Sequence, residues 1–198
     1  MNERAKSRNR QTQVSKTDLP FRILELDRDW QLIQLADQTY GWIPAKQVQR
    51  IKPGNYWAKI TYPVRNRLLR VPKPSRQKIN GILRKFARTP YLWGGTTERG
   101  IDCSAFVQHA VFEWTKVLLP RNSRVQRKYG VSTKCQQLCP LDLVFFVHKK
   151  TRKSHVGVYL DDKVWHFCLD KKGLASESFE ELKKRYNCSG ARRLCTFK

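Results

Sequence analysis

The fold is decided by the stretch Gly100-Ile101-Asp102-Cys103-Ser104-Ala105-Phe106, which places a cysteine at the start of an apolar helix. Behind Cys103, apolar residues recur every three or four positions, as on one helix face, until Pro120: Phe106, Val107, Ala110, Val111, Trp114, Val117 and Leu118. A helix N-terminus carries free N–H groups and a partial positive charge, and both favour a thiolate. Because the thiolate is the nucleophilic form of cysteine, Cys103 is a candidate catalytic nucleophile.

Three strand-like runs follow this helix, at 143–147, 155–160 and 163–168. His155 begins the second run, and His166 lies 11 residues further on, in the third. A hairpin turned at Asp161-Asp162 would place the two histidines side by side, so that His166 could orient His155 as the third group of a triad orients the base. A helix followed by an antiparallel meander predicts an α+β fold.

The N-terminal part of the chain has a different pattern. After a polar, basic stretch, short runs at 21–26, 30–35 and 40–44 read as strands separated by polar turns, which is typical of a small antiparallel barrel. Ser75 is the expected N-cap of a helix in which Ile79, Ile82, Leu83 and Phe86 recur at helical spacing, and Thr89-Pro90 ends that helix.

Six motifs in order, within residues 75 to 168, resemble those of the NlpC-type cysteine peptidases. They are Tyr91-Leu92-Trp93-Gly94-Gly95, Gly100 to Phe106, Pro120-Arg121-Asn122-Ser123-Arg124-Val125-Gln126, Pro140-Leu141-Asp142-Leu143-Val144-Phe145-Phe146, His155-Val156-Gly157-Val158-Tyr159-Leu160 and Trp165-His166-Phe167. Trp30 followed after a turn by Gly41-Trp42-Ile43 resembles a bacterial Src-homology-3-like wall-targeting module. This chain lacks the Arg-rich first strand that usually opens such a module.

The resemblance implies a papain-like catalytic domain, in which the helix carrying the cysteine packs on an antiparallel sheet. It divides the chain into a basic flexible tail (1–19), a partial Src-homology-3-like β module (20–52), a linker with room for one strand (53–74) and a peptidase domain (75–198). The implied reaction is hydrolysis of peptidoglycan stem peptides through a thioester.

The resemblance also assigns roles to residues. Cys103 would be the nucleophile, His155 the general base and acid, and His166 the polar orienter. Tyr91, Asp102 and Ser104 would line the substrate site, and Arg121 would be a scaffold residue beside it. Relatives with the same domain order hold the free amine of an N-terminal L-Ala with the Asp and Ser, and cut the γ-D-glutamyl bond to the diamino acid. We expect that specificity here.

One motif departs from the family pattern, because Leu141 stands where a Gly usually precedes the Asp of the strand motif. If this position has positive φ, leucine would be strained there.

The other cysteines indicate neither a metal site nor a disulfide scaffold. Cys135 and Cys139 form a C-x3-C pair without a clear second pair of zinc ligands. Five cysteines remain beside Cys103, an odd number that favours free buried thiols and a reducing setting. We expect no metal and no cofactor.

The 198 residues carry a net charge of +24, and the stretch between Asp37 and Glu98 holds 13 Lys or Arg and no acid. Such a block attracts polyanions, here possible anionic wall polymers, or is only a solvated face. Two alternatives stay open: a basic polyanion-binding protein without catalysis, and an amidase or acyltransferase on the same fold. No motif indicates specific nucleic-acid binding. We expect a monomer.

The longest apolar run, 143–147, is too short for a membrane span, which needs roughly 20 residues. The N-terminus is basic, but no apolar segment follows it. The localisation is therefore open: the cell envelope or outside, if an export segment precedes this chain, and otherwise the cytoplasm.

Overall fold

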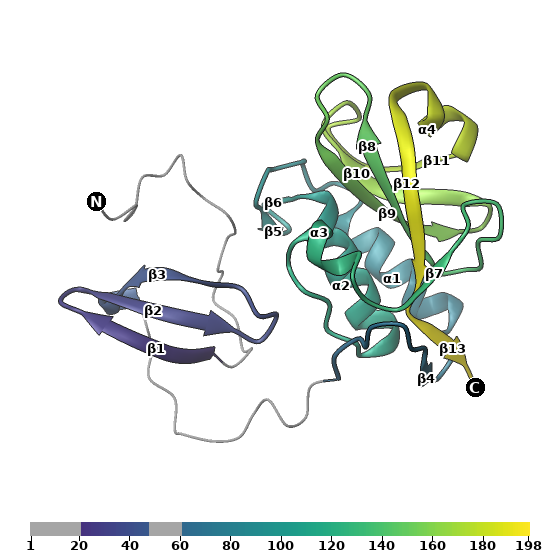
Figure 1. Ribbon diagram of the computed structural model, residues 1–198. Coiled ribbons are helices and arrows are strands. Elements are labelled where there is room, and N and C mark those ends of the chain that lie inside the picture. The colour runs from purple at the N-terminus through teal and green to yellow at the C-terminus, as the bar shows by residue number, and fades with distance from the viewer. Residues whose placement is uncertain (1–20, 48–60) are drawn as a thin grey trace.

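Three short strands form an antiparallel sheet at the N-terminal end of the described chain (Figure 1). In this computed structural model, which describes residues 21–47 and 61–198, they are β1 (Phe21–Asp27), β2 (Trp30–Leu35) and β3 (Tyr40–Pro44), and a 3-10 turn, η2 (Ala45–Gln47), follows. These are the three strands that the sequence predicts. The basic tail, the end of the β module and the first part of the linker lie outside the described residues, so closure into a barrel stays a prediction.

The described part of the expected linker, 61–74, lies along the larger unit. It carries β4 (Leu69–Val71), which pairs in parallel with the last strand, β13 (Cys195–Phe197). The three-stranded sheet also contacts this unit, since Gln108 Nε2 donates to Asp37 Oδ2 at 3.0 Å and the Tyr62 hydroxyl donates to the Ala36 carbonyl at 2.8 Å.

The larger unit is built on a six-stranded sheet in the order β11-β10-β9-β8-β12-β7 (Figure 1). The strands are β7 (Val131–Thr133), β8 (Leu143–His148), β9 (Ser154–Leu160), β10 (Lys163–Cys168), β11 (Gly173–Glu177) and β12 (Tyr186–Arg193), and all their pairings are antiparallel. Asp161 and Asp162 both have positive φ, 53° and 59°, as a two-residue hairpin turn between β9 and β10 requires.

Helices lie against both faces of this sheet. On one face, α1 (Arg76–Phe86) and α2 (Cys103–Thr115) bury the main core, in which Phe86, Phe106 and Phe167 meet. On the other face, α4 (Phe179–Arg185) covers a smaller core around Phe146, Val164 and Leu182. The remaining elements are a short helix, α3 (Ser123–Gln126), and a two-stranded ribbon of β5 (Thr96–Thr97) and β6 (Gly100–Ile101).

These layers confirm the predicted fold class, a mixed α+β domain whose cysteine-bearing helix packs on an antiparallel sheet. Ser75 caps α1, as expected, by accepting the Lys78 N–H at 3.2 Å. Helix α2 ends at Thr115, before Pro120, because Lys116 turns into the left-handed conformation. Among the described residues, no helix is both long and apolar enough to cross a membrane.

Candidate active site

The candidate nucleophile, Cys103, is the first residue of α2. Asp102 is the N-cap of this helix, and its side chain accepts the Ala105 N–H at 2.8 Å. The sulfur lies within hydrogen-bonding reach of the backbone N–H of Val156, the residue after His155. Cys103 is 5% exposed and lines a cavity of about 360 Å³ together with Trp93 and Ser154. The helix start thus meets the beginning of β9 at the wall of a cavity.

Burial determines the resting state of this thiol. Removal from water, and next the negative charge of Asp102, raise the pKa of Cys103 from 9.0 to about 12, while the Val156 N–H and Arg121 lower it. That rise corresponds to about 4 kcal/mol, whereas a helix N-terminus contributes at most about 2 kcal/mol. Burial therefore opposes the thiolate expected at the helix start and favours the neutral thiol.

The two predicted histidines are in direct contact. His155 Nε2 and His166 Nδ1 are 2.8 Å apart, and the rings are perpendicular to one another. This bond leaves Nδ1 of His155 as the nitrogen that can take the proton of a thiol. Burial, and next the electrostatic effect of the neighbouring His166, hold the pKa of His155 well below 6.5. The resting base is thus neutral.

The contact between the histidines depends on the register of the β9–β10 hairpin. Trp165 pairs with Val158, so His166 stands opposite Gly157 and lies diagonally from His155 on the same face of the sheet. A Cβ on Gly157 would lie 2.5 Å from Val164 Cγ1, 2.9 Å from the Trp165 carbonyl oxygen and 3.0 Å from His166 Cβ. Only glycine at this position leaves room for the pair.

Behind the histidines, the structure reveals two residues that the sequence analysis missed. His166 Nε2 lies 2.9 Å from Glu177 Oε2, and Arg185 Nη2 lies 2.5 Å from the same oxygen. His166 is fully buried and Glu177 is 8% exposed. The one trace in the sequence is the spacing, because Glu177 follows His166 by the same 11 residues that separate His166 from His155; this spacing acquires meaning only once the strand register is known.

Asp102 and Ser104, expected to bind substrate, belong to a buried ion-pair network. Arg121 holds Asp102 through two bonds, Nη1 to Oδ1 at 3.0 Å and Nη2 to Oδ2 at 2.7 Å, and also donates to Ser104 Oγ at 2.7 Å. Ser104 Oγ in turn donates to Asp102 Oδ1 at 2.9 Å, and the Gly94 N–H donates to Oδ2 at 3.0 Å. The scaffold role expected of Arg121 fits these contacts.

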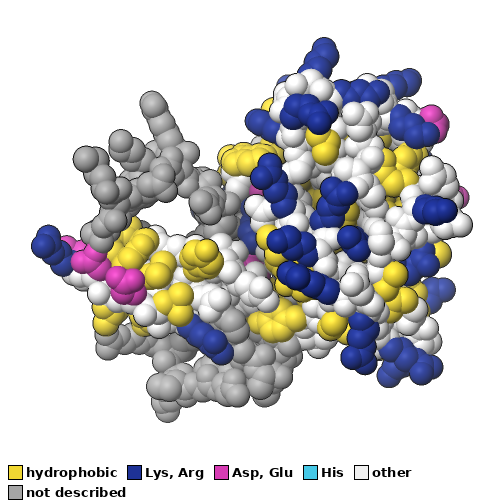
Figure 2. Space-filling model, in the orientation of Figure 1, with side chains coloured by type: hydrophobic (Ala, Val, Ile, Leu, Met, Phe, Trp, Pro, Cys, Tyr) yellow, Lys and Arg dark blue, Asp and Glu magenta, His cyan; other side chains and the backbone are white. Residues whose placement is uncertain are grey.

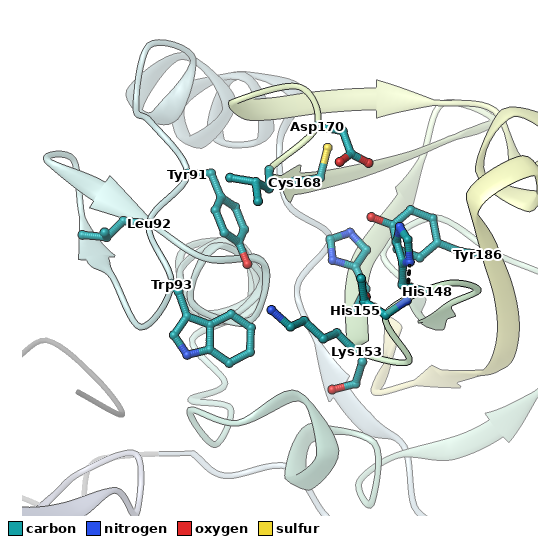
Figure 3. A pocket seen from close by; sticks show the side chains of 12 residues that line it. Tyr91, Leu92, Trp93, His148, Lys153, His155, Cys168, Asp170 and Tyr186 are labelled. Atoms are coloured by element: carbon teal, nitrogen blue, oxygen red, sulfur yellow. Dashed lines mark hydrogen bonds between the residues drawn. The ribbon is translucent and has the colours of Figure 1, made fainter. Parts of the chain in front are cut away.

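A second cavity, of about 410 Å³, opens on the histidine side of the cysteine. Trp93 and Ser154 line both cavities, so the two cavities adjoin, and we call them together the cleft. Tyr91 and Trp93 form one side of the second cavity, and His155 and Tyr186 face them across it (Figure 3). The His155 ring is stacked on Tyr186 at 5.0 Å, and Lys153 lies over Trp93 at 5.5 Å. Tyr91 thus lies in the cleft, as expected.

The remaining histidines and cysteines also have defined places. His109 contacts the Thr96 carbonyl and the Phe86 ring, so its role is structural. His148 is the last residue of β8 and lines the second cavity. Cys135 and Cys188 form a disulfide, which corrects the preference for free thiols, whereas Cys139, Cys168 and Cys195 are free.

Within residues 21–47 and 61–198, one group of side chains has donor atoms close enough to hold a metal ion: His166, Cys168 and Glu177, with ligand atoms within 4.8 Å of one another. The His166–Glu177 contact and the Arg185 ion pair already account for this proximity. The arrangement therefore does not require a metal.

Comparison with known proteins shows a family match over the part of the chain that contains these residues. The family model described as the NlpC/P60 family matches residues 88–190, a stretch that includes Cys103, His155, His166 and Glu177. This chain belongs to the NlpC/P60 family. A crystal structure of an NlpC/P60 family protein from Bacillus cereus superposes with a TM-score of 0.52 at 23% identity, covering 90% of this chain and 54% of the other, and so supports the fold.

Two curated NlpC/P60 relatives are more similar in sequence. The chain is 32% identical over 117 residues to a probable endopeptidase NlpC of Escherichia coli, which covers 59% of this chain and 76% of the relative. It is 33% identical over 94 residues to a gamma-D-glutamyl-L-lysine dipeptidyl-peptidase of B. cereus, which covers 46% of this chain and 28% of the relative. The chain thus spans most of one relative and under a third of the other.

Proposed function

We propose that this NlpC/P60 protein is a cysteine endopeptidase that hydrolyses peptidoglycan stem peptides. The observation that carries the proposal is the row formed by Cys103 at a helix start, His155 and His166, placed at an open cleft. A nucleophile, a base and a group that orients the base are the signature of covalent acyl transfer. Here His155 and His166 are 2.8 Å apart, and the Val156 N–H, next to His155 in the chain, lies within hydrogen-bonding reach of the Cys103 sulfur. The relatives named as an endopeptidase and a dipeptidyl-peptidase support the substrate class.

The neutral resting state of the site fixes the order of proton transfers. As the Cys103 sulfur attacks the substrate carbonyl carbon, its proton passes to Nδ1 of His155. The imidazolium then gives this proton to the nitrogen of the breaking C–N bond, which leaves as an amine, and a thioester remains. Water attacks the thioester and passes a proton to His155, which returns it to the departing sulfur. The first turn of α2 has backbone N–H groups without intrahelical acceptors, which suit the developing oxyanion.

Within this class, we propose the γ-D-glutamyl bond to the diamino acid as the one cleaved. The B. cereus relative is named for that linkage. Asp102 and Ser104 would shape the end of the cleft that takes the free amine of L-Ala. Because both Asp102 oxygens already accept bonds from Arg121, an incoming ammonium group would share this carboxylate with the guanidinium.

The specificity is tested with two modified substrates. Acetylation of the L-Ala amine of a stem peptide should block cleavage, because it removes the positive charge that Asp102 would attract. Amidation of the C-terminus should change the rate by less than about threefold, because the proposed contact at Asp102 is with the L-Ala amine and not with the C-terminal carboxylate. Equal rates on the two modified peptides would refute the free-amine specificity, while cleavage of both would leave the endopeptidase proposal standing.

A further inference from the structure

A chain of hydrogen bonds extends the candidate triad by one residue, across three neighbouring strands. His155 on β9, His166 on β10 and Glu177 on β11 share one face of the sheet. His166 pairs in register with Ala175, so Glu177 lies diagonally from His166, just as His166 lies diagonally from His155. The two links measure 2.8 and 2.9 Å.

We propose that Glu177 is a positioning residue that fixes the tautomers of both histidines in the reactive form. This proposal rests on the proposed function and adds a fourth member to the site. A carboxylate can only accept hydrogen bonds, so the bond to Glu177 requires a proton on Nε2 of His166. Nδ1 of a neutral His166 is then an acceptor, and it takes the proton on Nε2 of His155. His155 is left with an unprotonated Nδ1, the form that can take the thiol proton.

Arg185 is the partner of Glu177 at the end of this chain of hydrogen bonds. Its Nη2 contacts Glu177 Oε2, and its Nη1 lies 3.5 Å from Asp170 Oδ2. The guanidinium at 2.5 Å forms a charge-assisted bond with this carboxylate, whose oxygen also accepts the Nε2–H of His166. The chain of hydrogen bonds therefore ends in an ion pair between Glu177 and Arg185.

The same chain would stabilise the intermediate state of the reaction. When His155 takes the thiol proton it becomes an imidazolium among buried groups, and His166 Nδ1 accepts its Nε2–H. The negative charge of Glu177 then acts on the imidazolium through the fully buried His166 ring. Loss of the charge should thus slow the chemical step and leave substrate binding nearly unchanged, since Glu177 does not line either cavity.

The experiment compares Glu177→Ala, Glu177→Gln and a control, Glu180→Gln, whose residue is an exposed glutamate on the neighbouring helix α4. The first readout is 15N NMR of histidine-labelled protein, which reports the protonated nitrogen of each ring without any substrate. We expect His155 and His166 to carry protons on Nε2 in the wild type and the control. In Glu177→Ala we expect His166 to shift toward the Nδ1-protonated tautomer.

The second readout is the steady-state rate on a stem peptide. In Glu177→Ala, kcat should fall by about 10²-fold, the lower end of what a placed acid–base group contributes, with KM within about twofold of wild type. Glu177→Gln keeps an acceptor oxygen for Nε2–H but no charge, so its tautomers should be native and its loss of kcat smaller. Circular dichroism establishes that each variant is folded.

The two proposals fail separately. Wild-type tautomers and a wild-type kcat in a folded Glu177→Ala variant would refute the role of Glu177. A second outcome would also refute it: Glu177→Ala unfolds, while Glu177→Gln keeps native tautomers and a wild-type kcat. Glu177 would then be a structural residue only. Absence of stem-peptide cleavage by the wild type would refute the proposed function. In that case, the NMR readout would still test the role of Glu177, because it needs no substrate. Iodoacetamide labelling of Cys103, followed by peptide mapping, would compare the reactivity of the thiol in wild type and variants.

Discussion

At the scale of single residues, the site is governed by desolvation. Cys103 and His155 are both buried, and burial pushes the pKa of the thiol up and that of the imidazole down, so each group is neutral. A cysteine peptidase with a preformed thiolate–imidazolium pair would need the opposite shifts. These shifts favour transfer of the proton from sulfur during attack, and such a transfer depends on the orientation of His155.

The pH dependence of hydrolysis follows from this neutral pair. His155 is the active base when unprotonated, and its lowered pKa keeps the imidazole unprotonated at pH 6.5 and somewhat below. The titratable groups that lower this pKa further, beside burial, are His166, Arg185 and His148. We expect kcat/KM to be flat from pH 8 to 6.5 and to fall only at more acid pH. Initial rates, with circular dichroism at each pH as the control for unfolding, measure this limb. A midpoint at or above pH 6.5 would contradict the neutral base.

Another single residue stores strain, at the end of β9 opposite to His155. Leu141, which stands where the family usually has glycine, has φ of +72° and is buried. Its backbone N–H donates to the Tyr159 carbonyl at 2.7 Å, which holds the turn next to β9 in this conformation. A left-handed leucine costs roughly 1 to 2 kcal/mol, and the surrounding hydrogen bonds and packing sustain it. The strain expected from the sequence is thus present.

At the scale of elements, the β9–β10 hairpin brings the histidines together, and Gly157 is the position on which it depends. In Gly157→Ala, the new methyl group would meet Val164 and the Trp165 carbonyl, which should destabilise the protein by about 1 to 3 kcal/mol and separate His155 from His166. Urea denaturation measures the first effect and peptide hydrolysis the second.

The matched control is Gly81→Ala in helix α1, where a Cβ meets nothing within 4 Å. This substitution should stabilise the protein by up to about 1 kcal/mol, because alanine is the better helix former, and should leave hydrolysis unchanged. If Gly157→Ala matched this control in stability and rate, the close approach at Gly157 would not matter for the site.

Much of this element structure is readable from the sequence because it is local. The alternation in 155–160 and 163–168, with two aspartates between, predicts the hairpin, and the apolar period behind Cys103 predicts α2. Glu177 and Arg185 could not be assigned, since a glutamate at a strand end looks like any surface acid until the register with His166 is known. The Cys135–Cys188 disulfide spans 53 residues of chain, and no local pattern reports such a pairing.

At the scale of the whole molecule, positive charge covers much of the larger unit, and Lys and Arg side chains are spread over the face seen in Figure 2. Arg65, Arg67 and Arg70 are exposed members of the basic block that precedes α1. Long-range attraction by such charges would concentrate the enzyme on an anionic wall, and it is screened beyond roughly 10 Å at 0.1 M salt.

We therefore expect charge reversal of Arg65, Arg67 and Arg70 to weaken sedimentation with intact wall material, most strongly at low salt. Turnover of a small free peptide should stay within about twofold, because none of the three lines the cleft. A triple variant that pellets like wild type at low salt would mean that the block is only a solvated face. Loss of turnover on the free peptide would instead connect the block to the active site.

The central claim, that Cys103 attacks a stem-peptide amide, is tested most directly by mass spectrometry of one digestion. Wild type, Cys103→Ala and a control lacking an exposed free thiol, Cys139→Ala, are each incubated with L-Ala-γ-D-Glu-diaminopimelate-D-Ala. We predict the same two cleavage products from wild type and Cys139→Ala, and a rate at least about 10³-fold lower from a folded Cys103→Ala. Wild-type turnover by Cys103→Ala would contradict the account.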